Sequence, residues 1–321
     1  MNSIKIYRSA LDGKYYKASG NPESLRKFEA GGVIMPSDIS SVQAVTVLNE
    51  VLGLARPNYN LRNVCRVIPM DNLTMTIPIA TGLTGQRKVK PLEEAELSKQ
   101  AYTDVKFDLW KNVVHIAIPD ETNFKSAFPL MQMNMADAGR DLPRMENLDI
   151  ADELEGVITE KVSGSPYVDW GAVSSGVSTT NPFVNIQANL NYIQGKGFPV
   201  DFMAMHPTIF GKFVQNTYVR DLVRAGMATV TAQNGIPQSG AFTLPGFPTI
   251  RVITDYALTE TPTSSVGPIL GSSVAPGIVL GSGPTYATVY RDDNKDADAY
   301  KIRQFLQPKV VIQNALTMMC T

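Results

Sequence analysis

The feature that most constrains this chain is a polar stretch of twenty residues, 81–100, between two strand-like runs. Leu73 to Ala80 alternates apolar and polar side chains, and residues 102–118 are also strand-like. Loops of that length without structure of their own are uncommon inside a compact domain, and TGLTGQRKVKPLEEAELSKQ is too polar for a core. We therefore predict a long hairpin that projects away from the body of the protein.

The charges at the tip of this hairpin change sign along the chain. Three basic residues are followed by three acidic residues: Arg87, Lys88 and Lys90, then Glu93, Glu94 and Glu96. An extended hairpin is only marginally stable alone in water. This favours a projection that binds a partner over an ordinary solvated loop.

Residues 122–138 and 141–162 have the periodicity of helices, with Gly139 and Pro143 marking a break or kink. The second helix has one apolar stripe, formed by Leu142, Met145, Leu148, Ala151, Leu154 and Ile158. Its polar face is acidic, because seven acidic residues oppose Arg144 and Lys161: Asp141, Glu146, Asp149, Asp152, Glu153, Glu155 and Glu160.

The two ends of the chain differ in pattern. Residues 1–35 carry six basic and three acidic side chains with interrupting glycines, which indicates an arm that is either flexible or ordered by a partner. A helix follows over 37–52, and residues 163–180 form a Gly- and Ser-rich boundary between subdomains. Helices and strands then alternate to the end, a pattern typical of an α+β protein rather than a doubly wound nucleotide-binding fold.

Composition excludes several classes of protein. The chain has 321 residues, 44% of them hydrophobic, 18% charged and a net charge of −1, so it is neither wholly disordered nor built to coat nucleic acid. It has no apolar run long enough to span a membrane, and its first residues lack the apolar core of a signal peptide. Cys65 and Cys320 form no disulfide framework, which favours a reducing compartment.

The sequence has few residues or motifs suited to catalysis. We therefore expect no enzyme activity, no cofactor and no metal site. His115 lies in a strand-like run and favours a structural role, whereas His206 precedes Pro207 and favours helix capping or packing over catalysis. Nucleophile-elbow, phosphate-loop, dinucleotide and HExxH motifs are absent. The acidic run at 292–298 lacks the glycine and the final Glu of a calcium loop, so we interpret it as a solvated hairpin turn.

The order of these parts resembles the major capsid proteins of tailed bacteriophages and related archaeal viruses, which share the Hong-Kong-97-like fold. Three segments are similar to parts of that family: FMAMHPTIFGKFVQN, LPGFPTIRVITDYAL and YKIRQFLQPKVVIQNALTMM. The resemblance implies an N-terminal arm at 1–35 and a P-domain at 36–181, with an extended E-loop at about 80–102 and a spine helix at about 141–162. It also implies an A-domain at 182–300 and a return strand and tail in the P-domain at 301–321.

The resemblance further implies a self-assembling icosahedral shell, built of pentamers and hexamers in the host cytoplasm, that encloses double-stranded DNA through weak non-specific contact. The implied partners are a separate scaffolding protein, a portal and a decoration protein, with no membrane. We hypothesise that the basic hairpin tip, or the basic arm, meets the acidic helix face of a neighbour at Asp149, Asp152 and Glu153. Some members join subunits through a Lys–Asn bond, for which the residue types are present at Lys88, Lys90, Lys99 and Asn314.

Three other interpretations stay open at this stage. An encapsulin, a cellular compartment with the same fold, would enclose a cargo enzyme instead of DNA. A cytosolic α+β hydrolase or transferase would need a pocket around His115 or His206. A tail-tube protein would be mostly β, which the long helix disfavours.

Overall fold

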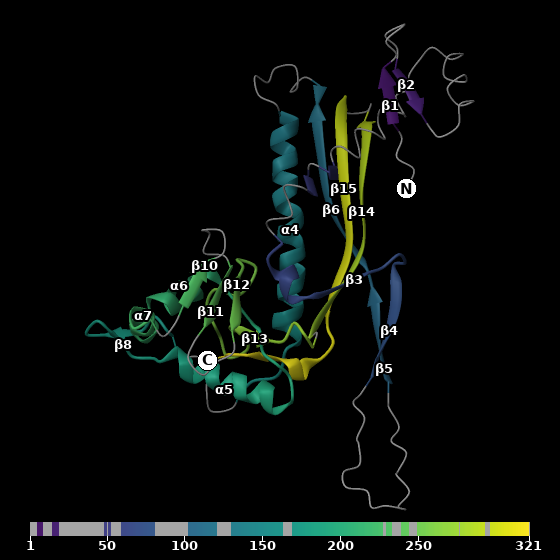
Figure 1. Cartoon of the computed structure of the whole chain (residues 1–321). Helices are drawn as coiled ribbons and strands as arrows, with labels where there is room; N and C mark the ends of the chain where they lie inside the picture. The colour runs from purple at the N-terminus through teal and green to yellow at the C-terminus, as the bar shows by residue number, and fades with distance from the viewer. Residues whose placement is uncertain are drawn as a thin grey trace, which may run out of the picture.

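The computed structural model describes residues 5–8, 15–18, 48–49, 51–52, 59–80, 102–120, 130–162, 169–226, 229–232, 239–243, 249–275, 277–292 and 296–320. No helix in these ranges combines the length and the hydropathy of a membrane span. The fold is α+β, with two main sheets of different character (Figure 1).

The first sheet has four strands in the order β3, β14, β15, β6 (Arg66–Pro69, Ile278–Asp292, Ala297–Val310 and Trp110–Pro119). β15 is antiparallel to both β14 and β6, and β3 runs parallel to β14. The long helix α4 (Leu130–Val157) lies along this sheet (Figure 1). Leu142 of α4 packs in one buried cluster with Ile302 of β15 and Val114 of β6, because alternate residues of each strand face the helix.

α4 runs through 28 residues without interruption, so of the predicted break or kink at Gly139 and Pro143 the break is wrong, and the helix spans Leu130–Val157 instead of about 141–162. Pro143 is buried within the helix, next to the fully buried Leu142. Packing against the sheet therefore outweighs the hydrogen bond that the proline ring removes. Beyond Val157 the chain extends instead of staying helical, and the amide of Met318 donates to the carbonyl of Glu160.

β4 (Thr74–Ala80) and β5 (Tyr102–Asp108) form the hairpin base that the sequence predicts. They pair antiparallel from Thr74 with Asp108 to Ala80 with Tyr102. The pair leads away from the four-stranded sheet (Figure 1). The connection between the two strands, which contains the predicted tip, lies outside the described residues.

The second sheet has six strands in the order β10, β11, β12, β9, β13, β16 (Thr229–Ala232, Ser239–Thr243, Ile250–Thr254, Phe202–Met205, Ile269–Gly271 and Leu316–Met318). It is accompanied by α5 (Pro182–Gly195), α6 (Pro207–Gln215) and α7 (Thr217–Arg224). The sequence predicts helices in the runs NPFVNIQANLNYIQGKG and PTIFGKFVQN and strands in VDFMAMH and IRVI, and the structure confirms them as α5, α6, β9 and β12. Residues 259–277 are rich in Ser, Pro and Gly, which predicts a loop, but the structure places the strand β13 within them.

The strand pairings group the chain differently from the expected boundaries at 182–300 and 301–321. β14 pairs with β15 and β3, so residues 278–292 belong to the four-stranded sheet rather than to the expected A-domain. β16 pairs with β13, so the end of the chain returns to the six-stranded sheet rather than to the expected P-domain. These pairings are non-local, and strand periodicity alone does not specify which strands pair.

One buried cluster joins the two sheets. Leu154 of α4, Phe202 of β9 and Leu306 of β15 pack together with Leu316 of β16. The two halves of the molecule therefore share a continuous core, although each sheet also has a cluster of its own.

Several short elements complete the described chain. β1 (Lys5–Arg8) and β2 (Tyr15–Ala18) pair antiparallel within the predicted arm, most of which lies outside the described residues. Residues 48–49 and 51–52 are helical, in agreement with the helix predicted there. The 3-10 turns η2 (Leu61–Val64) and η4 (Gln313–Ala315) and the small hairpin β7–β8 (Val173–Ser174 and Val177–Ser178) make up the rest.

Candidate functional site

The base of the β4–β5 hairpin carries an apolar groove of about 280 Å³. Its lining comes from five segments and includes Ile68, Ile77, Ile79, Phe107, Val279, Val311 and Ile312, with Arg66 at its edge. Large apolar side chains on the same hairpin are exposed: Leu73 by 58%, Met75 by 41% and Tyr102 by 64%. Met75 lies on the same face of the hairpin as Ile77 and Ile79, whereas Tyr102, opposite Ala80, lies on the other face. The groove and the exposed side chains make the hairpin base a candidate contact site.

The predicted contact residues of the hairpin tip cannot be placed, because Arg87, Lys88, Lys90, Glu93, Glu94 and Glu96 lie outside the described residues. The same holds for Lys99, one of the lysines considered for a cross-link. Their role therefore stays a prediction.

Of the three acidic residues predicted to face a neighbour, the structure leaves one exposed. Asp149 is half-buried and accepts a hydrogen bond of 2.7 Å from Asn112 Nδ2 of β6. Burial raises the pKa of Asp149, which the hydrogen bond from Asn112 opposes. Glu153 accepts from the backbone amide of Val310 at 2.9 Å, whereas Asp152 is exposed.

The other acidic residues of α4 are also engaged within the chain. Glu155 accepts two hydrogen bonds of 2.8 Å from Thr259, through the backbone amide and the hydroxyl. Asp141 pairs with Arg144 one turn away, at 3.8 Å. The acidic face predicted from the sequence is therefore distributed around α4 and used mainly to attach its neighbours.

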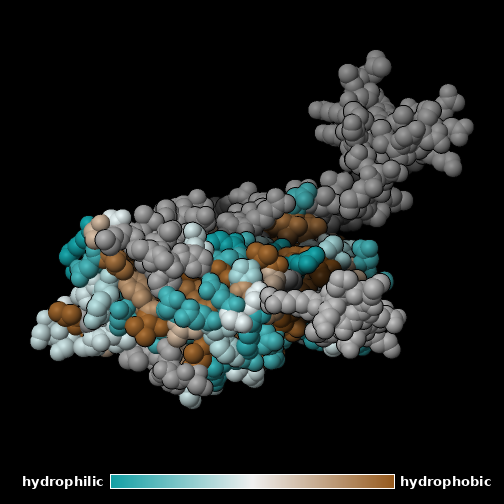
Figure 2. All heavy atoms as spheres, turned by 60° about the horizontal axis from the view of Figure 1, so that its bottom comes forward, coloured by the Kyte–Doolittle hydropathy of each residue, from teal (hydrophilic) through white to brown (hydrophobic). Residues whose placement is uncertain are grey.

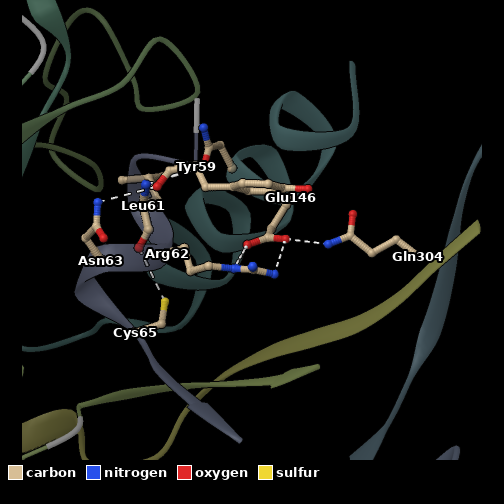
Figure 3. Close-up of polar contacts among 8 residues, drawn as sticks. Tyr59, Leu61, Arg62, Asn63, Cys65, Glu146 and Gln304 are labelled. Carbon is tan, nitrogen blue, oxygen red and sulfur yellow. Dashed lines mark hydrogen bonds and ion pairs between the residues drawn. The ribbon is translucent and has the colours of Figure 1, made fainter. Parts of the chain in front are cut away.

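Glu146 is the most enclosed of these carboxylates, with no exposed surface. Figure 3 shows Arg62 and Gln304 pointing toward its carboxylate. Arg62 of η2 binds it through two parallel hydrogen bonds, Nε to Oε1 at 2.7 Å and Nη2 to Oε2 at 2.9 Å, and Gln304 Nε2 of β15 donates to Oε2 at 2.6 Å. Burial raises the pKa of Glu146, while the Arg62 guanidinium opposes the rise. Burial, reinforced by the Glu146 charge, also raises the pKa of Tyr59 to about 12.

Asn147, the next residue, turns toward the other half of the molecule. Its Nδ2 donates to Asp255 Oδ2 at 2.8 Å, and its Oδ1 accepts from the amide of Leu61 at 3.3 Å. Asn60 Nδ2 donates to the same Asp255 oxygen at 3.0 Å. Asp255 follows β12, so this cluster fastens the six-stranded half to α4 and η2.

The sequence did not single out Arg62, Asn147 or Asp255. The sequence does contain one indication that Glu146 is buried. Glu146 directly follows Met145 of the apolar stripe, so it lies near the buried side of the helix. Nothing in the sequence identifies the partners, because Arg62 is 84 residues from Glu146 and Asp255 is 108 residues from Asn147.

Asn314, considered above for a cross-link, lies beside a lysine of its own chain. Lys196 Nζ donates to Asn314 Oδ1 at 2.9 Å and to Glu160 Oε2 at 2.9 Å. Tyr192 OH donates to the same Glu160 oxygen. The hydrogen bond from Tyr192 lowers the pKa of Glu160, and contact with Tyr192 and Glu160 raises the pKa of Lys196. The contacts with Tyr192 and Glu160 thus favour the ammonium form of Lys196 over the neutral amine.

Both histidines have structural partners. His206 caps α6, because its Nδ1 accepts from the amide of Thr208 at 3.2 Å, which confirms the predicted capping role. His115 Nε2 forms a 2.8 Å hydrogen bond with Tyr290 OH across the four-stranded sheet. Within the described ranges, no group of three or more His, Cys, Asp or Glu side chains could hold a metal ion.

A second apolar surface lies on the six-stranded half, where α7 packs against β8. Its exposed side chains are Val173 and Val177 of the small hairpin, Val184 of α5, and Tyr218 and Val223 of α7. Figure 2 shows hydrophobic residues at the surface of this end of the molecule, on the left of the view. The hairpin base and this end of the molecule thus both expose large apolar side chains.

Comparisons with known proteins identify the fold. No protein-family model matches the chain, and no curated protein matches it. Among solved structures, the virus-like particle from Pyrococcus furiosus aligns with a TM-score of 0.56 at 10% identity, over 86% of this chain and 99% of that one. The capsid of the cyanophage P-SCSP1u aligns with a TM-score of 0.58 at 13% identity, over 79% and 85%. A structure from the Gordonia phage Cozz aligns with a TM-score of 0.54 at 14% identity, over 80% and 84%.

Proposed function

Because the chain has the Hong-Kong-97-like fold, we propose that it is a shell-forming subunit, the major capsid protein of a tailed virus that encloses double-stranded DNA. The observation that supports this proposal is the agreement in fold with a virus-like particle and a phage capsid across most of the chain. Shell proteins with this fold are structural and non-enzymatic. The engaged histidines are compatible with that role, and they weaken the hydrolase or transferase alternative.

In this proposal the elements take the roles that the fold implies. α4 is the spine helix, and it supports the four-stranded sheet as a P-domain. β4 and β5 are the base of the E-loop, β1 and β2 belong to the N-terminal arm, and the six-stranded half is the A-domain. The A-domain then includes β16, and β14 belongs to the P-domain.

We assign the contacts between subunits to the exposed apolar surfaces. Subunits that stay together usually bury about 2,000 Å² or more. The groove at the hairpin base and the surface formed by β8 and α7 supply apolar area for such contacts. The basic tip residues Arg87, Lys88 and Lys90 then meet Asp152, the predicted acidic residue that stays exposed on α4. Exposed ion pairs contribute about 0–1 kcal/mol each, so they set register more than strength.

An encapsulin-like compartment is the second candidate, and the match to the Pyrococcus furiosus particle favours keeping it. Both candidates form closed shells, and they differ in what the shell encloses. Under the viral proposal the partners are a separate scaffolding protein, a portal and a decoration protein, and the shell is assembled in the host cytoplasm.

Electron microscopy of the purified full chain, beside size-exclusion chromatography, tests the proposal. We expect closed shells, tubes or rings of pentamers and hexamers. Nucleic acid in shells isolated from the native source supports the capsid, whereas an enclosed enzyme supports the compartment. A chain that stays monomeric, also after a candidate scaffolding protein is added, contradicts both.

A further inference from the structure

The face of the four-stranded sheet opposite α4 has an unusual set of side chains at its β14–β15 hairpin end. We define the open face by Tyr286 and Tyr290 of β14, Lys301 and Arg303 of β15, and Lys111 and His115 of β6. Residues directly opposite each other on paired strands project to the same side, and the register pairs Tyr286 with Arg303 and Lys301 with His115. The hydrogen bond between Tyr290 and His115, which crosses over β15, confirms that β14 and β6 present these two residues on the same face.

The residues that alternate with these along each strand point to the other side of the sheet, toward α4. Gln304 of β15 reaches Glu146, and Asn112 of β6 reaches Asp149. The acidic residues of α4 are therefore on the other side of the sheet from the open face. Asp292, near the turn of the β14–β15 hairpin, is the acidic residue that the strand pattern places on the open face within the described residues. The three cations Lys111, Lys301 and Arg303 thus leave the face basic.

The aromatic rings of the open face are exposed but held in position. Tyr286 is 52% exposed and Tyr290 40% exposed, about 13 Å apart along one strand. Tyr290 lies nearly parallel to the His115 ring at 6.0 Å between centroids, and Tyr286 meets Phe305 edge-on at 6.3 Å. Arg303 lies opposite Tyr286 in the strand register and donates through Nη2 to Thr288 Oγ1. Rings fixed in this way lose little conformational freedom when a ligand stacks on them.

We propose that the open face binds single-stranded nucleic acid, with Tyr286 and Tyr290 stacking on bases and Lys111, Lys301 and Arg303 contacting phosphates. A sheet that presents aromatic rings among cations offers both interactions that an unpaired strand needs. Duplex DNA offers only its phosphates to the cations, because its bases are already stacked. An acidic peptide would likewise use the cations and leave the rings without a stacking partner. This inference does not depend on shell formation.

Fluorescence anisotropy with a labelled oligothymidylate of about 12 nucleotides tests the proposal. We expect the full chain to bind it, and Tyr286→Ala and Tyr290→Ala each to weaken binding about fivefold or more. Lys301→Glu weakens binding and reduces its salt dependence. Tyr256→Ala, at an exposed tyrosine of the other half, is the matched control and leaves binding unchanged.

The same titrations are made with a duplex of equal length and with an acidic peptide, residues 91–97 of this chain. Each titration is made separately on assembled and on unassembled protein. Equal affinity for duplex with no effect of the tyrosine variants overturns the proposal, and so does absence of oligothymidylate binding in both fractions. Tighter, tyrosine-dependent binding of the acidic peptide assigns the face to a protein partner and also overturns it. Microscopy of the same samples shows whether shells form, so that failure here is distinguished from failure of the proposed function.

Discussion

At the scale of single residues, Glu146 shows that an acidic position on a helix does not have to face solvent. The sequence groups it with the acidic polar face of α4, but it has no exposed surface and binds Arg62 and Gln304. A buried carboxylate is tolerated only when partners replace its lost hydration. The three residues belong to α4, η2 and β15, so the charge pair fixes how these elements meet.

Arg62→Ala should lower the free energy of unfolding by about 3–5 kcal/mol, because it leaves Glu146 buried without its cation. Urea denaturation of the purified subunit measures the loss. Arg62→Ala combined with Glu146→Gln should recover part of it. Arg144→Ala is the control, since Arg144 and Asp141 form an exposed pair, and it should change stability by less than about 0.5 kcal/mol. A loss no larger than that of the control would contradict the importance of the pair.

The pH dependence of Glu146 has a definite sign. Its pKa is raised in the folded chain, so the folded state binds this proton more tightly than the unfolded state. The stability that Glu146 contributes is therefore fully present below its ordinary pKa of 4.5 and is lost as pH rises through the folded value. The unfolding free energy of the wild-type protein minus that of Glu146→Gln should increase as pH falls from 7 toward about 5. A difference that shrinks on acidification would show that Arg62 outweighs burial.

At the scale of elements, α4 and the β4–β5 hairpin differ in role. α4 mainly holds the subunit together, and the hairpin mainly exposes apolar surface. Glu153 and Glu155 of α4 accept hydrogen bonds from Val310 and Thr259, whereas Asp152 stays exposed. The hairpin contributes a groove and exposed apolar side chains at its base. In the proposed assembly, contacts within a subunit and contacts between subunits use different residues, so each set can be changed independently.

Reversing the tip charges with Arg87→Glu, Lys88→Glu and Lys90→Glu should impair assembly while the isolated subunit stays folded. The sequence predicts that the tip projects away from the body of the protein, so its charges are expected to act only across an interface. Electron microscopy measures assembly and circular dichroism measures the fold. Asp152→Lys should impair assembly in the same way, whereas Asp137→Lys, at an exposed residue paired with Arg140, is the matched control. Normal shells from the triple variant would refute the contact.

At the scale of the whole molecule, the end of the chain closes the six-stranded sheet. β16 pairs with β13, and the buried Leu316, Met318 and Met319 connect both halves of the core. A Cβ atom added at Gly267 would lie 1.8 Å from the carbonyl oxygen of Met319, so the chain approaches that glycine very closely.

Deleting residues 316–321 should unfold the subunit or make it aggregate. Burial of one large apolar side chain contributes about 1.5–3 kcal/mol, so losing three removes much of a net stability of about 5–15 kcal/mol. Gly267→Ala should lower the thermal midpoint through the same contact, and deletion of Thr321 alone is the control. Calorimetry or thermal circular dichroism measures these changes. A deletion variant as stable as the wild-type protein would show that β16 is dispensable.

The sequence by itself determined the local elements with strong periodicity: the β4 and β5 runs, the buried strand β9, the helices α5 and α6, and the cap at His206. Each depends on neighbours in sequence, and the order of these elements carried the resemblance to the capsid fold. The tertiary structure decided what depends on distant partners. In the folded chain α4 continues through Pro143, and Ile150 is buried whereas Leu148 is exposed. β14 and β16 pair in sheets other than those expected. The reason is physical: strand pairing and the burial of Glu146 are settled by contacts between residues far apart in the chain, which the order of residue types does not encode locally.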